Sequence, residues 1–266
     1  MKRLFPFLLA LMCLLSSCGW FQHKTADEKN EWAEVGRMDR LEIRFLTTGD
    51  RAAWQQMQTE FPQPTRLLVE NMLHLGTIGH PEVSSRFFQL FADTVPQAVL
   101  QAVDQQYADI SDINKHLNLS FRRLQRDFPD MLMPHFYAQI GAFKESVVVN
   151  DSLVGISFDK YLGEDFEPYA LYFTPEQRKS MTRWYVVPDC ISFYLLSLYP
   201  LSEADQQDED IRRLYMARIM WIANKAMRNA FFKNKQVQAV DQFMHNHPNM
   251  SAEDLLLQVP LDAIRP

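Results

Sequence analysis

Acidic side chains gather in the middle of the sequence, where they could bind a cation or carry out acid–base chemistry. Five of them fall within 17 residues: Asp151, Asp159, Glu164, Asp165 and Glu167. A calcium loop of the EF-hand type needs oxygen ligands at short, regular spacing around a glycine turn, and this spacing does not provide it. We therefore expect solvated charge at most of these positions. A hydrolytic site that uses Asp159, Asp165 or the later Asp189 is the alternative.

The histidines do not form a recognisable metal site. A zinc hydrolase helix carries the pattern H-E-x-x-H, and none of the seven histidines is followed by Glu. His245 and His247 lie close together, but Pro248 follows and no third ligand suggests itself. There is also no P-loop and no dinucleotide-binding fingerprint. We expect no metal ion, no cofactor and no identifiable catalytic residue.

The segment from Asp159 to Gly163 is the best-defined candidate motif, because it follows a run of strand-forming residues. A carboxylate at the end of a strand can accept hydrogen bonds from the next backbone N–H groups and so fix the exit from the sheet. Gly163 permits a backbone turn that is closed to other residues. We expect Tyr161 and Leu162 to pack back on the core. This motif is therefore predicted to be a structural corner first; the alternative is that Asp159 projects into a cleft and takes part in binding or catalysis.

The elements that position this motif are mostly helices. The clearest helical run extends from Ile113 to Phe128, with Asp112 as its cap and Pro129 as its stop. Residues 146–158 read as two strands around an Asn-Asp-Ser turn. The fold class is predicted to be α+β, a mostly α-helical single domain with a small antiparallel sheet. The other predicted helices cover residues 31–46, 50–60, 65–75, 81–92, 96–108, 176–185, 188–199, 209–232, 235–246 and 251–257.

The N-terminus carries an export signal. Lys2 and Arg3 precede the apolar run 4–15, which as a helix would be about 18 Å long and too short for a bilayer core of about 30 Å. Leu15-Ser16-Ser17-Cys18 then resembles the lipobox of bacterial lipoproteins, in which the cysteine is acylated with chains such as palmitate. We expect a signal peptide over 1–17, lipidation at Cys18, a tether over 18–30 and one domain over 31–266. Cys190 is then the remaining thiol, and its apolar neighbours predict that it is buried and inert.

A family resemblance comes from the candidate motif and its surroundings. The segment from Ile156 to Asp165, with Tyr169 and the later run from Tyr185 to Asp189, resembles the gliding-motility lipoprotein GldB family. Those proteins have a lipobox, a helical first half and a strand that ends in a pattern like Ile-Gly-Leu-Asp-x-Tyr-Leu-Gly. The resemblance covers about residues 110–200, and Ser157 stands where the family usually has glycine. Asp159, Tyr161, Gly163, Asp165 and Asp189 are the candidate functional or structural residues that it points to.

The resemblance implies a membrane-anchored accessory protein rather than an established enzyme. Its layout also resembles zincin peptidases, in which the helix from Val187 would occupy the metal-binding place, but that helix contains no histidine. We expect a cell-envelope lipoprotein, on the periplasmic side of the outer membrane, that acts through envelope proteins in gliding motility or secretion. A degenerate zincin-like or unconventional hydrolase is the alternative.

The net charge of the chain bears on whether its partner could be a nucleic acid. The formal net charge is −6. This excludes a general nucleic-acid binder, because phosphate contacts need concentrated Lys and Arg. Arg122, Arg123 and Arg126 form one basic patch, which we interpret as a solvated face or as partners for acids. The oligomeric state is left open by the sequence.

Overall fold

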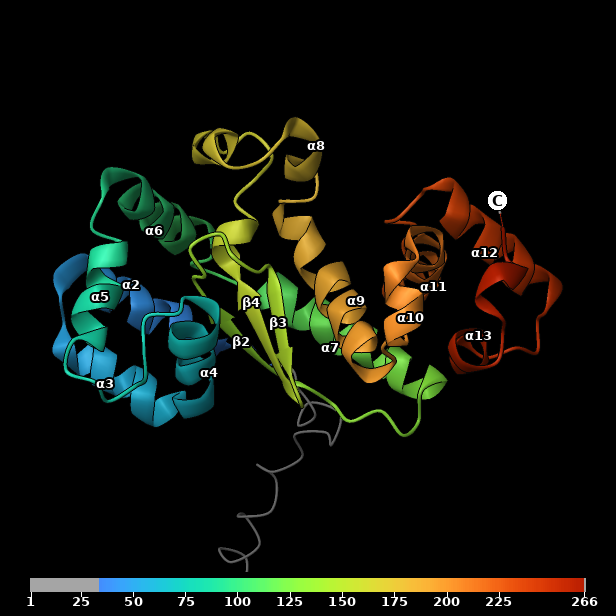
Figure 1. Cartoon of the computed structure of the whole chain (residues 1–266), viewed down its shortest axis with the longest axis horizontal. Coiled ribbons are helices and arrows are strands. Elements are labelled where there is room, and N and C mark those ends of the chain that lie inside the picture. The colour runs from blue at the N-terminus through green and yellow to red at the C-terminus, as the bar shows by residue number, and fades with distance from the viewer. Residues whose placement is uncertain (1–33, 266) are drawn as a thin grey trace, which may run out of the picture. The chain divides into compact units, whose positions relative to one another are not determined.

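The central sheet of the computed structural model has four strands, and the structure describes residues 34–265 (Figure 1). The strands are β1 (Gly36–Arg37), β2 (His135–Gln139), β3 (Val147–Asn150) and β4 (Leu153–Ser157), in the order β1-β2-β4-β3. β1 pairs with β2 and β2 with β4 in parallel, whereas β3 pairs with β4 antiparallel. The sheet is therefore mixed, and the prediction of an antiparallel sheet is correct for the hairpin alone.

The hairpin lies where the sequence places it. β3 and β4 pair from Val147 opposite Ile156 to Asn150 opposite Leu153, and Asp151 adopts a left-handed turn conformation with φ 50°. Strands β1 and β2 were not predicted. The partner of β1 lies about a hundred positions away along the chain. β2 is buried from its second residue onward, so it shows no alternation of apolar and polar side chains.

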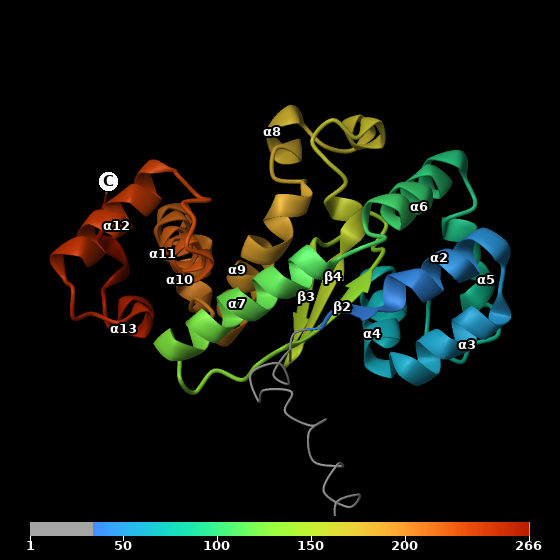
Figure 2. The same ribbon diagram turned by 180° about the vertical axis from the view of Figure 1, so that it is seen from behind.

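Helices of the first half cover both faces of the sheet. On one face Phe121 of α7 contacts Phe136 of β2, with ring centroids 5.0 Å apart, and Figure 2 shows α7 crossing the sheet on this side. On the other face the Gln139 side chain approaches Met72. The helices are α2 (Met38–Thr48), α3 (Arg51–Glu60), α4 (Pro62–Arg66) with a π-helical continuation (Leu67–Met72), α5 (Val83–Leu90), α6 (Thr94–Gln106) and α7 (Ser111–Asp127).

Two details of these helices differ from the prediction. The helix expected over 31–46 begins at Met38, because Gly36 and Arg37 join the sheet; residues 31–33 lie outside the described residues. Asp112 does not cap α7: the Asp109 carboxylate accepts the Ser111 N–H at 2.8 Å, and Asp112, in the first turn, forms an ion pair with Arg183. The helix still ends at Asp127, two residues before Pro129.

The second half begins with an irregular excursion between β4 and α9. A 3-10 turn (Phe158–Lys160) follows β4, and Thr174 caps α8 through a capping box. The helix predicted over 176–185 is wrong in extent, since α8 has four residues and a separate 3-10 turn precedes α9. The elements are a 3-10 turn (Glu167–Leu171), α8 (Pro175–Arg178), a 3-10 turn (Arg183–Tyr185), α9 (Val186–Leu198), α10 (Glu203–Gln207), α11 (Glu209–Met227), α12 (Lys235–Asn246), α13 (Ala252–Leu257) and a 3-10 turn (Leu261–Ala263).

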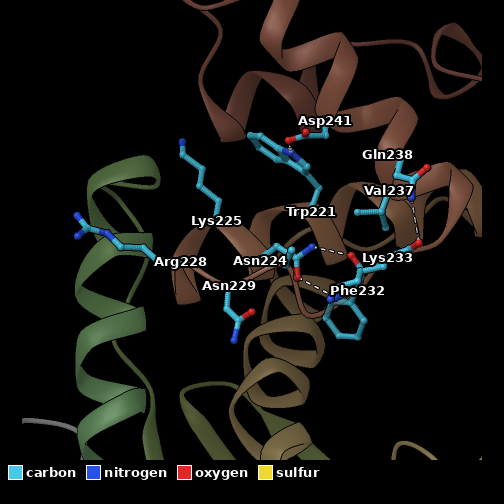
Figure 3. A pocket seen from close by; sticks show the side chains of 11 residues that line it. Trp221, Asn224, Lys225, Arg228, Asn229, Phe232, Lys233, Val237, Gln238 and Asp241 are labelled. Atoms are coloured by element: carbon cyan, nitrogen blue, oxygen red, sulfur yellow. Dashed lines mark hydrogen bonds between the residues drawn. The ribbon is translucent and has the colours of Figure 1, made fainter.

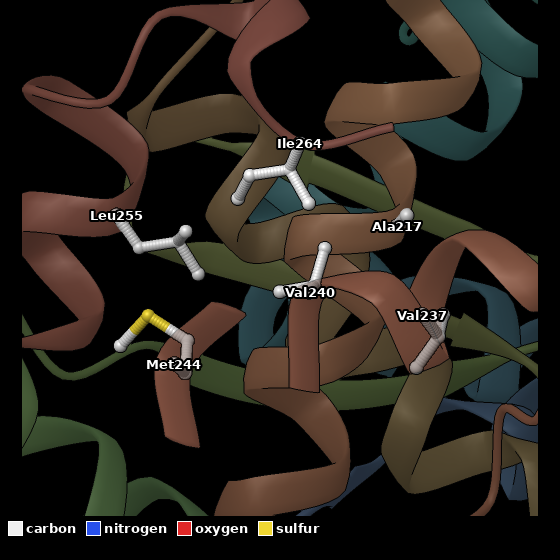
Figure 4. Packing of buried hydrophobic residues seen from close by; sticks show 6 residues of the cluster. All are labelled: Ala217, Val237, Val240, Met244, Leu255 and Ile264. Atoms are coloured by element: carbon white, nitrogen blue, oxygen red, sulfur yellow. The ribbon is translucent and has the colours of Figure 1, made fainter. Parts of the chain in front are cut away.

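Helix α11 packs against the C-terminal elements through a small apolar cluster. Figure 4 shows its buried members, which are Ala217, Val237, Val240, Met244, Leu255 and Ile264. The guanidinium of Arg218 is buried beside this cluster and donates to the carbonyl oxygens of Leu255, Val259 and Pro260, which lie at and beyond the end of α13. No helix within residues 34–265 is long and apolar enough to cross a membrane.

Candidate functional site

The motif that follows β4 lies at the carboxyl edge of the parallel strands. Asp159 is in the 3-10 turn directly after β4, and its carboxylate is fully buried. One oxygen accepts a hydrogen bond from the Gly141 N–H at 2.9 Å and the other from the Phe143 N–H at 2.7 Å. These two donors belong to the loop after β2 rather than to the residues that follow Asp159. The carboxylate therefore joins the exits of two adjacent strands.

The loop that holds Asp159 has an uncommon backbone. Ala142 and Phe143 both have positive φ, 50° and 61°, which non-glycine residues rarely adopt. The N–H groups of Gly141 and Phe143, on either side of Ala142, both point to the carboxylate in this turn. Burial raises the pKa of Asp159, while the two backbone N–H bonds act in the opposite direction. Both carboxylate oxygens of Asp159 accept backbone hydrogen bonds and are buried. The side chain therefore links two loops inside the protein and offers no atom to an external ligand.

Tyr161 connects the same corner to helix α9. Its buried hydroxyl donates to a carboxylate oxygen of Asp189 at 2.8 Å, across 28 positions of sequence. Asp189 lies in the first turn of α9 and is half-buried. Burial raises the pKa of Asp189 to about 7, although the hydrogen bond from Tyr161 lowers it. This carboxyl group therefore changes its charge near neutral pH, unlike an ordinary aspartate.

The remaining two candidate residues have different surroundings. Gly163 has φ 119°, a conformation closed to other residues, and its N–H donates to the Met181 carbonyl at 2.9 Å. Asp165 is exposed and forms no ion pair or side-chain hydrogen bond with the described residues. The structure thus brings Asp159, Tyr161 and Asp189 into one connected corner, places Gly163 at its end, and leaves Asp165 in solvent.

Two further tyrosines stabilise this corner: Tyr169, named above only as part of the family resemblance, and Tyr107, which sequence reasoning missed. The Tyr107 hydroxyl donates to the backbone carbonyl of Tyr161 at 2.7 Å, and the Tyr107 ring stacks on Phe158 at 4.0 Å between centroids. The Tyr169 hydroxyl donates to the carbonyl of Asp159 and accepts from the N–H of Leu162. Tyr107 comes from the end of α6, about fifty residues earlier, so no local signal marks it.

It also missed a pair of buried acids on α2. Arg37 holds Asp39 through two hydrogen bonds of 2.8 and 2.7 Å. Glu42 accepts from the Ile140 N–H at 3.0 Å through one oxygen, while its other oxygen has no hydrogen-bond partner among the described residues. Burial raises the pKa of Glu42 well above the usual value, and the nearby charges of Asp39 and Asp159 raise it further. A signal was present, because both acids share the face of α2 that buries Met38, Phe45 and Leu46.

The chemistry of this region is that of an internal hydrogen-bond network. Besides the free oxygen of Glu42, the Tyr137 hydroxyl and the Gln139 carbonyl oxygen are buried without a partner among residues 34–265. Within the same residues there is no group of three His, Cys, Asp or Glu side chains that could hold a metal ion. Three pockets of about 470 Å³ each are lined by other segments.

A comparison with models of protein families assigns the chain to a family. The model of the family described as gliding motility protein GldB matches residues 22–230, more than half of the sequence, including the whole corner and α9. The chain belongs to the GldB family. It is therefore a gliding-motility-related lipoprotein of the cell envelope. No curated protein and no solved structure matches the chain.

The family match covers only part of the chain, residues 22–230. The match ends at residue 230, just beyond α11, so α12 and α13 lie outside it. It begins at residue 22, and the lipidation predicted at Cys18 lies outside both the match and the described residues. The segment from Ile156 to Asp165 that suggested the family lies well inside it. In this structure that segment is an enclosed corner, except for Glu164 and Asp165 at its end, which are exposed.

Proposed function

We propose that this GldB-family chain is a lipid-anchored accessory protein that binds other envelope proteins and supports gliding motility or the associated secretion without catalysing a reaction. The observation that carries this proposal is the burial of Asp159, whose two oxygens are both used to join strand exits. A hydrolase of the acid type needs carboxylates that reach a substrate. The most distinctive acid of the motif serves the fold instead.

Exposed apolar side chains support a role in protein binding. Three of them lie in the segment between β4 and α9, which contains α8 (Figure 1). Leu171 is 69% exposed, Tyr172 60% and Trp184 71%. Trp and Tyr are enriched at the centres of protein interfaces, because they bury much area and can still form hydrogen bonds. A protein partner would remove this surface from water.

The anchor in this proposal is the lipid on Cys18, at the periplasmic face of the outer membrane. A lipobox cysteine carries more than one acyl chain, and two chains hold a protein on a membrane durably where one does not. The folded residues 34–265 need no spanning helix to remain attached. A short tether then leaves the domain free to meet its partners.

A substitution of the lipidated cysteine tests this proposal. Cys18→Ala is expected to release the protein from the membrane pellet and to abolish complementation of a deletion strain in gliding or secretion assays. Envelope fractionation and spreading on agar measure the two effects. As a matched control, Cys190→Ala removes the buried thiol of α9 and should leave attachment unchanged. A Cys18→Ala protein that stays in the membrane pellet as the wild type does would contradict the anchor.

A further inference from the structure

A pocket of about 470 Å³ opens at the C-terminal end of α11 (Figure 3). Trp221 and Phe232 give it an apolar wall, and Lys225, Arg228 and Lys233 surround it. Lys225 and Arg228 extend away from the helix backbone in Figure 3. A volume of this size suits a small ligand or one large side chain of a partner.

The positive charge continues from this pocket onto α7. The Arg123 guanidinium donates to the Ala226 carbonyl of α11 at 2.7 Å. Its pKa is lowered by burial and then by the neighbouring charges of Arg228 and Arg126, so the three guanidinium groups repel one another. We call Arg123, Arg126, Lys225, Arg228 and Lys233 the basic surface.

Most of this charge is not neutralised within the protein. Among residues 34–265 the one ion pair of the basic surface joins Lys225 to Asp127, with 3.0 Å between the amine and the carboxylate. The pocket also contains Asp241, which accepts a hydrogen bond from the Trp221 indole N–H at 2.8 Å. The sign of the surface is opposite to that of the chain, whose net charge is −6.

Arg228 occupies a position that normally belongs to glycine. It ends α11 in the left-handed conformation, φ 53° and ψ 39°, with its N–H bonded to the helix carbonyls. Glycine is preferred at such a helix end because a side chain is strained there. Basic residues also favour helix C-termini, but Lys225 already supplies one in the last turn. Arg228 forms no ion pair with any acid in the part of the chain that the structure describes, and a strained residue of this kind indicates a functional use of its charge.

We propose that the basic surface binds an acidic segment of a partner protein, with one bulky apolar side chain of that segment in the pocket. The charges extend over α7, the end of α11 and the loop that follows it, which suits several carboxylates in a row better than a single anionic group. A flat lipid surface would touch the outer charges and leave the recess empty. The inference rests on the proposed function, in which the chain acts through protein partners.

Fluorescence anisotropy of a labelled peptide tests the inference on the full chain. The probe is a fluorescein-labelled peptide of glutamates around one phenylalanine, and glutamines replace the glutamates in the control peptide. We expect the chain to bind the acidic probe, and the double variant Arg228→Gly/Lys233→Gln to bind about fivefold to tenfold more weakly. Higher salt should weaken the wild-type complex, because exposed charges are screened.

The variants separate binding from folding. Arg228→Gly places the preferred residue in the left-handed position, so the double variant should melt no lower than the wild type. Lys115→Gln/Arg66→Gln removes the same charge from two exposed positions elsewhere and should leave binding unchanged. Equal binding of the acidic and glutamine probes, equal binding by the double variant, or tighter binding to anionic phosphatidylglycerol vesicles than to the probe would each overturn the inference. The proposed function would survive those results if cross-linking still captured envelope proteins through another surface.

Discussion

Asp159 shows how one buried side chain can set the geometry of two loops. Its oxygens satisfy two backbone N–H groups that would otherwise be buried without acceptors, beside two residues of positive φ. An asparagine of the same shape has only one acceptor oxygen, and its amide would face a second donor. The charge of this residue is thus part of the loop structure.

We expect Asp159→Asn to lower the free energy of unfolding by about 2–3 kcal/mol, the cost of leaving a buried donor unpaired. Urea denaturation measures this change. Asp165→Asn is the control, because that side chain is exposed, and it should change stability by less than about 0.5 kcal/mol. A stable Asp159→Asn protein that fails to complement the deletion strain would instead make Asp159 a genuine site residue.

At the scale of elements, the conformation of the irregular segment between β4 and α9 depends on the turn at Gly163 near its start. Gly163 ends the corner with φ 119° and bonds to Met181 near the far end of the excursion, so a strained residue here would disturb both ends. The sequence predicted the glycine turn and the burial of Tyr161 and Leu162, because glycine position and hydrophobicity are local signals. It could not predict the hydrogen bonds from Gly141 and Phe143 to Asp159, or the one from Tyr107 to Tyr161, since these contacts join separate segments of the sequence.

Gly163→Ala is expected to lower the free energy of unfolding by about 1–3 kcal/mol, although open space surrounds the added methyl group. The cost arises from the backbone conformation alone. Thermal melting measures it. Lys179→Ala, an exposed position between β4 and α9, is the control and should leave the melting temperature unchanged. A melting temperature of Gly163→Ala equal to that of the wild type would show that the turn relaxes freely.

At the scale of the whole molecule, the raised carboxyl pKa values of three buried acids, Glu42, Asp159 and Asp189, give the fold a preference for mildly acidic conditions. The pKa of Asp189 is about 7 and that of Glu42 is well above its usual value, both because of burial. The folded state therefore holds protons that the unfolded chain releases near pH 4. Stability from these groups is complete below that pH and is lost as the pH rises through the folded-state pKa values.

We expect the free energy of unfolding of the wild type to fall between about pH 4 and about pH 7. Asp189→Asn should flatten this fall by up to about 1.4 kcal/mol per pH unit, because the amide oxygen still accepts the Tyr161 hydroxyl but no longer ionises. Urea denaturation across this pH range provides the curves. Parallel curves for the two proteins would contradict the assignment of the fall to Asp189.

The mixed sheet was the main feature of the whole fold that the sequence did not reveal. Helices and the hairpin leave local traces, such as the apolar spacing of α7 and the turn at Asp151. The parallel pairing of β1 with β2 leaves none, because each strand is short and its partner is specified by packing of the helices between them. The same holds for Glu42, whose partner Ile140 is 98 positions away.

That parallel pairing also sets an order of events during biosynthesis. Gly36 pairs with Tyr137, and β2 in turn needs β4, which ends at Ser157. A nascent chain therefore cannot complete the sheet until more than half of its residues have left the ribosome. Closing a loop of this length is entropically costly and slows folding. The growing chain is therefore without its completed central sheet until residues around Gly36, Tyr137 and Ser157 can meet.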